Sequence, residues 1–457
     1  MSSAPKKSKS LKEIIQDFTG KTGLRFEPWP VFIVGILLLF IAILFMRGLA
    51  FLALSLALFL APLWLPLLVI GGAWDLWYIL QRSEFLARQK YVLLEIKPPR
   101  NLVKTPLAME TFLATINLTG GESNWYARFW GGTRPFWSLE IASFEGQVHF
   151  YIRTREGFRR TVESQLYAQY PGVQIVEAPD YTRSISAKTE EWGIWGCDFK
   201  HTEKDPLPIK TYIEFGLDKV QKEPEQVDPL AQIIEFMGAL SKGEYFWLQF
   251  IVRAHKGEKY AKSNKEGKTY TWKDEAKEMI EKIREGTRSK YFDPTTGKEM
   301  PGFPNPTKGE SEKMAAMERN ISKLAFDVGA RAVYLARPEK FNGGFIANII
   351  ALFKPFSSEG WNGIRASGWM MNFDDYPWEI GASKKKDSFR RGLVEAYRRR
   401  QFFYDPFFEG GLRAKDAMVM STEELATIFH VPSGTVQTPG LARVPSATAE
   451  APANLPT

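Results

Sequence analysis

The chain has 457 residues, a net charge of +8 and a single cysteine, Cys197. One cysteine cannot form a disulfide framework or a cysteine-ligated zinc site within one chain, which excludes disulfide-stapled scaffolds and agrees with a reducing compartment. The length leaves room for two or three domains. The positive charge suits an anionic membrane leaflet, a nucleic acid or an acidic protein, and does not choose among them.

Residues 1–27 form a basic arm that is rich in lysine and serine. Leu11, Ile14, Ile15 and Phe18 recur in it at helical spacing. Two interpretations stay open for this arm: a short amphipathic helix on a membrane surface, or a disordered arm with a solvated charge cluster.

Residues 28–74 are almost wholly apolar. No charge occurs from Pro28 to Met46 or from Gly48 to Trp74, and Arg47 lies between these two stretches. A helix needs about 20 apolar residues to cross a bilayer. The pattern predicts a transmembrane helical hairpin over 28–80, with two spans joined by a tight turn at Met46-Arg47-Gly48. A buried hairpin of a soluble domain would have a polar outer face, and a signal peptide would lie nearer the start, before a cleavage site.

Lysines and arginines flank the apolar stretch on both outer sides, whereas the expected turn has only Arg47. The positive-inside rule therefore predicts that both termini are cytoplasmic. Tryptophans are enriched where a span meets the headgroups. We expect an interfacial belt that includes Trp29, Trp64, Trp74 and Trp77.

Residues 90–182 follow the order β-α-β-β-α-β, which is typical of a ferredoxin-like domain. Runs with strand character alternate with helical ones, and Glu145-Gly146 marks a hairpin between the two middle strands. The expected strands are 91–99, 137–144, 147–154 and 173–180, and the expected helices are 104–118 and 155–170.

Residues 190–380 repeat this pattern with an insertion at about 256–323. The expected strands are 210–217, 244–255 and 327–337, and the expected helices are 228–241 and 341–356. The insertion is charged and contains helical segments. We therefore expect an α+β protein: a membrane hairpin followed by two ferredoxin-like domains, the second of them interrupted.

Residues 381–430 form a basic helical segment. Between Lys384 and Arg400, eight Lys and Arg residues face two acidic ones, a net charge of +6. The segment is a candidate contact surface for nucleic acid, lipid or an acidic protein, and the alternative is an ordinary solvated helix face. The candidate contact residues are Lys384, Lys385, Lys386, Arg390, Arg391, Arg398, Arg399 and Arg400. Residues 431–457 have the composition of a disordered linker or tail.

Motifs for catalysis do not emerge from the sequence. Thr295 to Glu299 resembles a P-loop only superficially, since Glu299 stands where Ser or Thr would ligate magnesium. The Asp374-Asp375 pair has no further ligands near it in sequence. We therefore predict no catalytic, cofactor-binding or metal-ligating residue. The aromatic loop from Gly120 to Pro135 either fills space beneath the first sheet or docks on a bilayer or a partner.

Several blocks resemble the N-terminal region of membrane-anchored conjugative coupling ATPases, the DNA pumps of bacterial type IV secretion systems. The blocks run from Ser138 to Thr154, from Val162 to Thr182, from Asp228 to Arg253, from Met420 to His430 and from Thr438 to Pro456. The resemblance implies an inner-membrane location, a homo-oligomer and DNA transfer. In that family a Walker A motif follows such a linker, and here the printed chain ends at Thr457.

We therefore expect a non-enzymatic membrane component that anchors and assembles with a separate P-loop ATPase, with DNA as a possible further partner. Two alternatives stay open. One is a membrane scaffold that binds anionic lipid or other proteins, and the other is a membrane-bound enzyme with an unrecognised site.

Overall fold

A computed structural model describes residues 35–40, 47–122, 125–185, 191–219, 228–257, 270–293, 298–368, 382–405, 417–434, 438 and 440–444. The chain divides into two units, Met1–Leu76 and Trp77–Thr457. Each unit is described by itself below.

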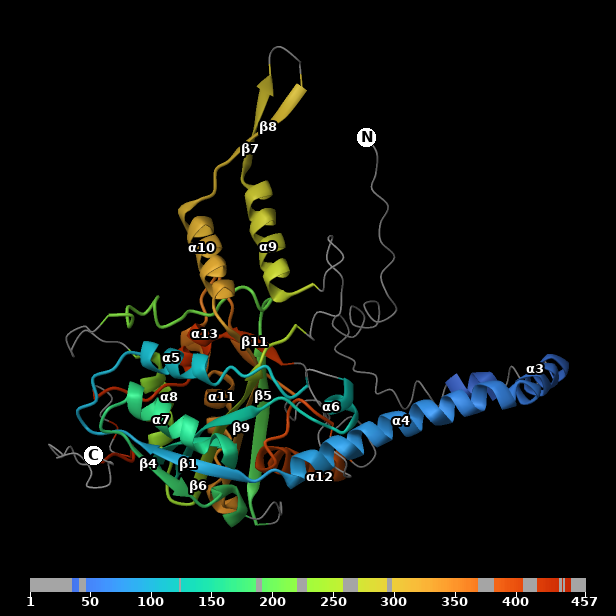
Figure 1. Cartoon of the computed structure of the whole chain (residues 1–457), viewed down its shortest axis with the longest axis horizontal. Coiled ribbons are helices and arrows are strands. Elements are labelled where there is room, and N and C mark those ends of the chain that lie inside the picture. Colours follow the sequence, from blue (N-terminus) through green and yellow to red (C-terminus); the bar gives the residue numbers. More distant parts are fainter. Residues whose placement is uncertain are drawn as a thin grey trace. The chain divides into compact units, whose positions relative to one another are not determined.

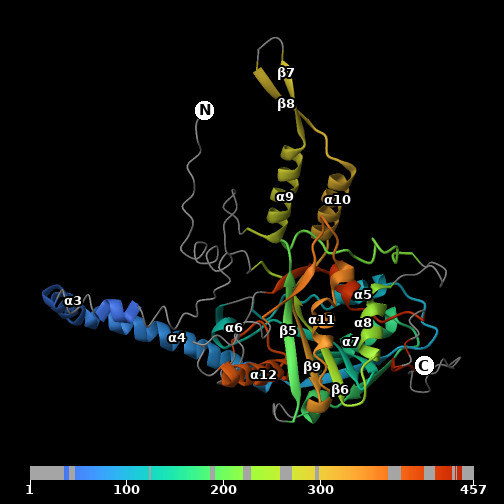
Figure 2. The ribbon, with the colours of Figure 1, turned by 180° about the vertical axis from the view of Figure 1, so that it is seen from behind.

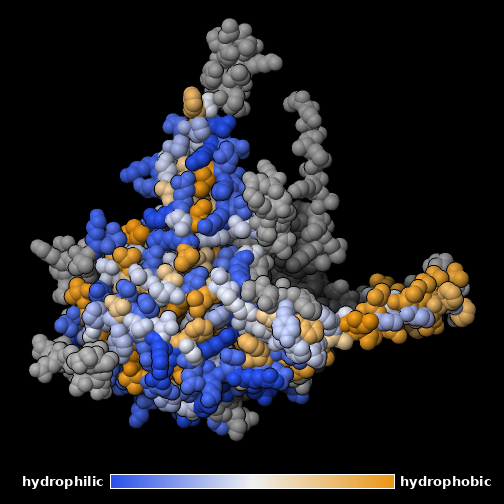
Figure 3. All heavy atoms as spheres, in the orientation of Figure 1, coloured by the Kyte–Doolittle hydropathy of each residue, from blue (hydrophilic) through white to orange (hydrophobic). Residues whose placement is uncertain are grey.

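The first unit contains apolar helices whose side chains are exposed. Residues 35–40 are helical, α3 spans Arg47–Phe59, and α4 begins at Ala61 and runs to Arg88. Phe59 is 80% exposed and Leu67 is 73% exposed. The surface of this segment is coloured as hydrophobic in Figure 3.

The break between the two helices falls at Leu60, and not at the predicted turn. Arg47 and Gly48 lie in the first turn of α3, so the prediction of a turn at Met46-Arg47-Gly48 is wrong for these two residues. Pro62 explains the break, since a proline lacks the N–H that a continuous helix needs. The indole of Trp64 bridges the break, because its Nε1 donates to the carbonyl of Ala57 at 2.9 Å.

Among the described residues, Ala61–Arg88 is the one helix long and apolar enough to cross a membrane. Much of the first predicted span, and Trp29, lie outside the described residues. The side chains of Trp64, Trp74 and Trp77 are all exposed. The two-span hairpin therefore stays a prediction.

The second unit is built on one antiparallel sheet of nine strands (Figure 1). Its order is β10-β5-β9-β6-β2-β3-β1-β4, with β11 paired to β9. The strands are β1 (Tyr91–Lys97), β2 (Phe136–Phe144), β3 (Gln147–Arg155), β4 (Gln174–Ala178), β5 (Gly193–His201), β6 (Glu244–Ala254), β9 (Ala325–Ala336), β10 (Ile364–Ser367) and β11 (Met418–Ser421).

The two halves predicted from the sequence share this sheet. β2 and β6 pair in antiparallel register from Phe136↔Arg253 to Phe144↔Tyr245. The strand order is β4-β1-β3-β2 in the first half and β10-β5-β9-β6 in the second, so corresponding strands occupy corresponding places. The α+β class is therefore confirmed, but the halves form a single sheet.

Helices cover both faces of the sheet. One face carries the main core, which contains Leu139, Phe150 and Phe250 and is covered by five helices. These helices are α5 (Leu107–Thr115), α7 (Arg159–Gln169), α8 (Pro229–Gly238), α11 (Gly344–Ile350) and α13 (Thr422–Ile428). The other face packs Trp247 and Val333 against α12 (Ala382–Arg398). The central strands are buried on both faces, which explains their nearly continuous apolar sequence.

Short elements complete the described unit and connect the larger ones. They are α6 (Trp125–Phe129), η1 (Glu156–Phe158), η2 (Tyr181–Ser184), η4 (Pro338–Lys340) and η5 (Lys354–Phe356). The end of α4 also packs on this unit. Gly131 adopts a φ of +74°, and a Cβ there would lie 2.4 Å from the carbonyl of Gln81, so only glycine permits this close approach.

The insertion lies between β6 and β9, as predicted. It comprises α9 (Trp272–Gly286), the strands β7 (Arg288–Asp293) and β8 (Lys298–Pro304), and α10 (Lys308–Ser322). Figures 1 and 2 show α9 and α10 side by side, with the two-stranded hairpin at their far end. At their base, Ile280 and Met317 pack on Leu207. The sequence did not indicate the hairpin, because its strands are rich in charge and proline.

Two predictions in this unit are wrong. Residues 210–217, expected as a strand, form consecutive turns, and β5 supplies the strand instead. The carboxylate of Glu214 accepts a hydrogen bond from the backbone N–H of Thr211 at 2.8 Å, which favours the turn. The predicted disordered tail is partly ordered too, since the N–H of Val148 donates to the carbonyl of Gly440 at 2.7 Å.

Candidate functional site

Helix α12 carries the basic residues that the sequence singled out. Its inner side packs Leu393, Val394 and Tyr397 in the core of the second sheet face. Lys384, Arg391 and Arg399 are exposed, and Lys385, Lys386 and Arg390 are partly buried. Contact of these six with nucleic acid or lipid stays a prediction.

Arg398 and Arg400 behave differently from their neighbours because they point into the protein. The Nε of Arg398 donates to the carbonyl of Thr182 at 3.0 Å, and its Nη2 donates to the carbonyl of Ile185. Arg398 also pairs with Glu395 at 2.7 Å. Arg398 therefore joins α12 to the segment that follows β4.

Arg400 is fully buried and binds two carboxylates. Its guanidinium donates to Glu140 at 2.9 and 3.1 Å and to Asp180 at 2.6 and 3.0 Å. Such two-pronged contacts are the strongest that arginine makes with carboxylates. The prediction that Arg400 contacts a nucleic acid or lipid surface does not fit this structure, because its charge is already satisfied inside the sheet face.

Hydroxyls complete this network around Glu140. Ser138 and Tyr181 donate to its carboxylate at 2.5 and 2.6 Å, and the hydroxyls of Tyr181 and Tyr397 are 2.8 Å apart. Burial alone would raise the pKa of Glu140, but the charge and hydrogen bonds of Arg400 hold it below its ordinary value. The backbone of Arg400 has a φ of +51°, a strained conformation of order 1 kcal/mol that these contacts offset.

A cavity of about 1390 Å³ opens beside this network. It is bounded by the end of α4 and Gln89, by the start of β1, by the segment after β4, and by the chain from Glu395 to Asp405. Arg398, Arg399 and Arg400 are among the lining residues. Arg153 of β3 and Tyr91 of β1, which the sequence did not single out, line it too.

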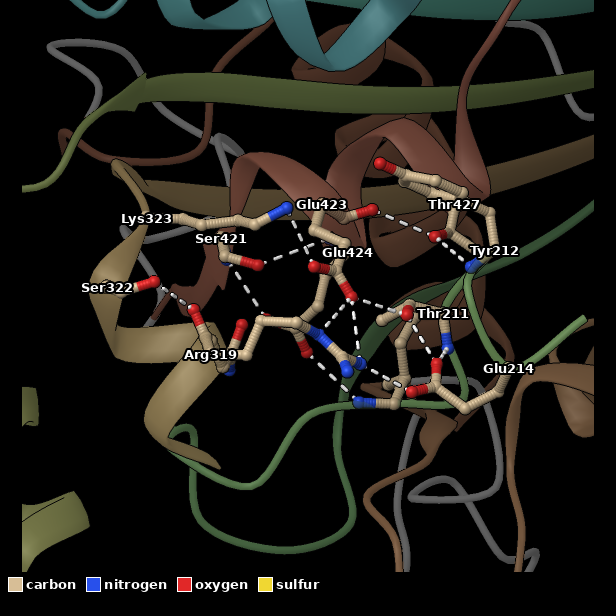
Figure 4. A network of polar contacts seen from close by, with 12 residues as sticks. Thr211, Tyr212, Glu214, Arg319, Ser322, Lys323, Ser421, Glu423, Glu424 and Thr427 are labelled. Carbon is tan, nitrogen blue, oxygen red and sulfur yellow. Dashed lines mark hydrogen bonds and ion pairs between the residues drawn. The ribbon is translucent and has the colours of Figure 1, made fainter. Parts of the chain in front are cut away.

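A second polar cluster lies at the base of the insertion and is shown in Figure 4. Glu423 of α13 pairs with Arg319 at 3.2 Å and Lys323 at 2.8 Å, and accepts a hydrogen bond from Thr211 at 2.6 Å. Arg319 also pairs with Glu214. The end of α10 is thereby bound to α13 and to the turns at 211–217.

Glu424 closes the capping box at the start of α13, as the sequence predicted. Its carboxylate accepts hydrogen bonds from the N–H of Ser421 at 3.0 Å and of Ile209 at 3.1 Å. The whole helix is buried. Burial raises the pKa of Glu424 to about 7, and the nearby His201 and the backbone N–H groups oppose that rise.

The remaining sequence candidates are resolved in part. Asp374 and Asp375 lie outside the described residues. Cys197 is fully buried in the main core. Within the described ranges no group of three His, Cys, Asp or Glu residues could hold a metal ion.

The aromatic loop exposes at least two of its rings. Tyr126 and Trp130 are exposed, whereas Trp137 of β2, just after the loop, is buried in the main core. Docking of the loop on a bilayer or a partner stays a prediction.

Comparison with known proteins places this architecture in a family. A family model described as "Domain of unknown function (DUF8128)" matches residues 81–443, and the chain therefore belongs to that family. The matched region begins in α4 after the apolar stretch and contains the whole described sheet. No curated protein matches the chain.

The Arg400 network predicts a sharp contrast between neighbouring arginines. Arg400→Ala leaves Glu140 buried without its counter-charge, and we expect a loss of about 3–5 kcal/mol in the free energy of unfolding. Arg399→Ala, on an exposed side chain, serves as the control and should change it by at most about 0.5 kcal/mol. Thermal unfolding of the full chain in detergent measures both. Equal stability of the two variants would contradict a structural role for Arg400.

Glu424 predicts a pH dependence of stability. Its pKa is about 7 in the folded chain, against 4.5 for the unfolded group. Between pH 4.5 and pH 7 the folded chain therefore binds a proton at Glu424 that the unfolded chain has lost, and the free energy of unfolding falls as the pH rises through this range. The free energy of unfolding of the wild type minus that of Glu424→Gln should fall by about 2 kcal/mol between pH 5 and pH 7.5, because the variant does not titrate at this position. The exposed Glu312→Gln is the control, and a pH-independent difference would refute the assignment.

Proposed function

We propose that the chain is a non-enzymatic inner-membrane component of a conjugative, type IV secretion DNA-transfer apparatus, which anchors and assembles with a separate P-loop ATPase. The observation that carries the membrane part is helix α4. Its first half exposes apolar side chains, and its last turns pack on the sheet unit through Gln81 and Phe85.

Exposure of this extent favours a lipid environment. Leu63, Leu67, Leu68 and Ile70 are each more than 60% exposed, on a helix long enough to cross the hydrocarbon core. Soluble proteins rarely leave so large a continuous apolar surface in water. We interpret 28–80 as a hairpin of two spans with both termini cytoplasmic. A single span through α4 is the competing topology.

We interpret each half of the sheet as a ferredoxin-like unit. The paired strand orders, each with the first strand between the third and the fourth, support this interpretation, as does the order of helices along the chain. Pairing of β2 with β6 joins the two halves of the sheet into one broad surface, which we assign to self-association and to docking of partners.

The assignment to DNA transfer rests on the resemblance. The resembling blocks include β2 and β3, the segment from α7 to β4, the segment from α8 to β6, and the unit of β11 and α13. They therefore contribute to one sheet and its main helical face. In proteins with such a region, the ATPase core drives DNA through a ring, and we assign this chain the anchoring and assembly role.

A membrane scaffold that binds anionic lipid is the second candidate. The exposed cations Lys384 and Arg391 of α12, and Arg399 just after it, favour this candidate, because the side of the helix with Leu393, Val394 and Tyr397 is buried in the core while these cations are exposed. This candidate needs the same anchor but no ATPase.

The topology predicts the labelling of introduced cysteines by a membrane-impermeant maleimide in spheroplasts. Cys197, the only native cysteine, is fully buried, so background labelling should be low, and Cys197→Ser removes it. Gly48→Cys should be labelled, whereas Ser8→Cys and Ser358→Cys should react only after lysis. Labelling of Ser8→Cys together with protection of Ser358→Cys would replace the hairpin by a single span. Labelling of Ser358→Cys would overturn the cytoplasmic placement.

The apparatus assignment predicts a specific partner. Purification of the detergent-solubilised protein from its native membrane, followed by mass spectrometry, should recover a P-loop ATPase. A chain with its β2–β6 pairing disrupted by Ile141→Asp should lose that ATPase if the folded sheet is the platform. Recovery of the intact protein alone would contradict the assignment and favour the lipid-binding scaffold.

A further inference from the structure

The cavity beside Arg400 is lined by an arginine, Arg153, that forms no ion pair among the described residues. The guanidinium carbon of Arg153 lies 3.8 Å from the centroid of the Tyr91 ring, and both residues line the cavity. Within the described part of the chain, no carboxylate pairs with Arg153. The hydroxyl of Tyr91 is buried there without a hydrogen-bond partner among the described residues.

The acidic residues around the cavity do not supply the missing charge. Glu177 pairs with Arg159, Asp180 pairs with Arg400, and Glu395 pairs with Arg398. Glu84 pairs with Arg88 at 2.5 Å, and Asp405 has an interaction of its own. Arg183, which is exposed at the same rim, has no ion pair among the described residues. Arg153 and Arg183 are therefore the two arginines of the lining that form no ion pair among the described residues, although the charges of Glu140 and Asp180 act on Arg153.

The environment of Arg153 makes an anion favourable. Burial, and next the positive charge of Arg400, lower the pKa of Arg153 to about 10. The side chain remains protonated at neutral pH. Its charge is partly removed from water, which costs free energy, and an anion bound beside it would offset that cost. An arginine fork is suited to the oxygens of a phosphate group.

Apolar side chains also line the cavity. They are Leu80, Leu86 and Ala87 of α4, together with Phe402 and Phe403. Leu80 follows Trp74, the end of the apolar stretch, by six residues in the sequence.

We propose that this cavity binds a phosphate group, with Arg153 and Arg183 as its cationic ligands and the Tyr91 hydroxyl as a further hydrogen-bonding partner. The group belongs either to the headgroup of a phospholipid, whose glycerol and first acyl carbons would meet the apolar wall, or to a free phosphate. The lipid source rests on the proposed membrane anchor, whereas phosphate binding itself does not.

The test uses the full chain in a neutral detergent and isothermal titration calorimetry. The three probes are dihexanoylphosphatidylglycerol, inorganic phosphate and dihexanoylglycerol, which lacks the phosphate. We expect the phospholipid to bind and Arg153→Leu to weaken that binding about tenfold or more, as expected for loss of a charge-assisted contact. Arg153→Lys should recover part of the loss. Arg160→Ala, an exposed arginine on α7 outside the cavity, is the matched control.

The outcomes separate the sources of the phosphate. Tighter binding of the phospholipid than of inorganic phosphate identifies the lipid headgroup, and equal binding identifies a free phosphate. Equal binding of dihexanoylglycerol, or no effect of Arg153→Leu, overturns the proposal.

A stability measurement separates this role from a structural one. Without ligand, Arg153→Leu should unfold at the wild-type temperature or higher, because it removes a charge that forms no ion pair among the described residues. A fall of several degrees would show that Arg153 supports the fold, and the proposal would fail. Phosphate binding can succeed even if the topology or the ATPase partner is refuted, so the two proposals fail independently.

Discussion

The pairing of β2 with β6 is the contact on which the rest of the second unit depends. Each strand would otherwise be the edge of a four-stranded half-sheet, with unpaired backbone groups open to another chain. Their nine-residue register closes both edges at once. It also places Leu139 and Phe250 in one core, so that helices from distant segments pack on a single continuous surface.

The same pairing leaves a second face that must be covered, and α12 covers it with unusual chemistry. The strands present Glu140 and Gln249 on this face, and both are fully buried. Gln249 donates to Glu140 at 3.3 Å and to the carbonyl of Tyr397 at 3.2 Å. A buried carboxylate in a central strand requires a buried cation, and Arg400 supplies it just beyond the end of α12. The polar network thus specifies where this helix docks.

Much of this fold could be predicted from local sequence patterns. β1, β3 and β4 followed from runs with strand character, and Ser421 with Glu424 marked the start of α13 correctly. The β2–β6 pairing could not be predicted, because the local pattern of each strand does not say which of its edges meets another strand. Residues 210–217 showed strand-like alternation, but the hydrogen bonds that Thr211 donates to the carboxylate of Glu214 favour turns there.

The candidate site was harder to predict than the fold. Arg398, Arg399 and Arg400 are identical in sequence, yet one binds backbone carbonyls, one is exposed and one is buried. The helix ends at Arg398, and the positive φ of Arg400 turns its side chain inward, which a charge count cannot reveal. Arg153 was missed for a related reason: an arginine in a strand gives no signal until it is known that none of the described carboxylates forms an ion pair with it.

The insertion has a mechanical consequence. Its two ends leave the sheet at adjacent central strands, where Ala254 of β6 is paired with Phe326 of β9. A pull on the β7–β8 hairpin would therefore act to peel β6 from β9, breaking their hydrogen bonds one after another from that end. Arg319 and Lys323 lie between the hairpin and this point and hold α10 to Glu423. Those ion pairs would have to break before a pull through α10 reached the hydrogen bonds between β6 and β9.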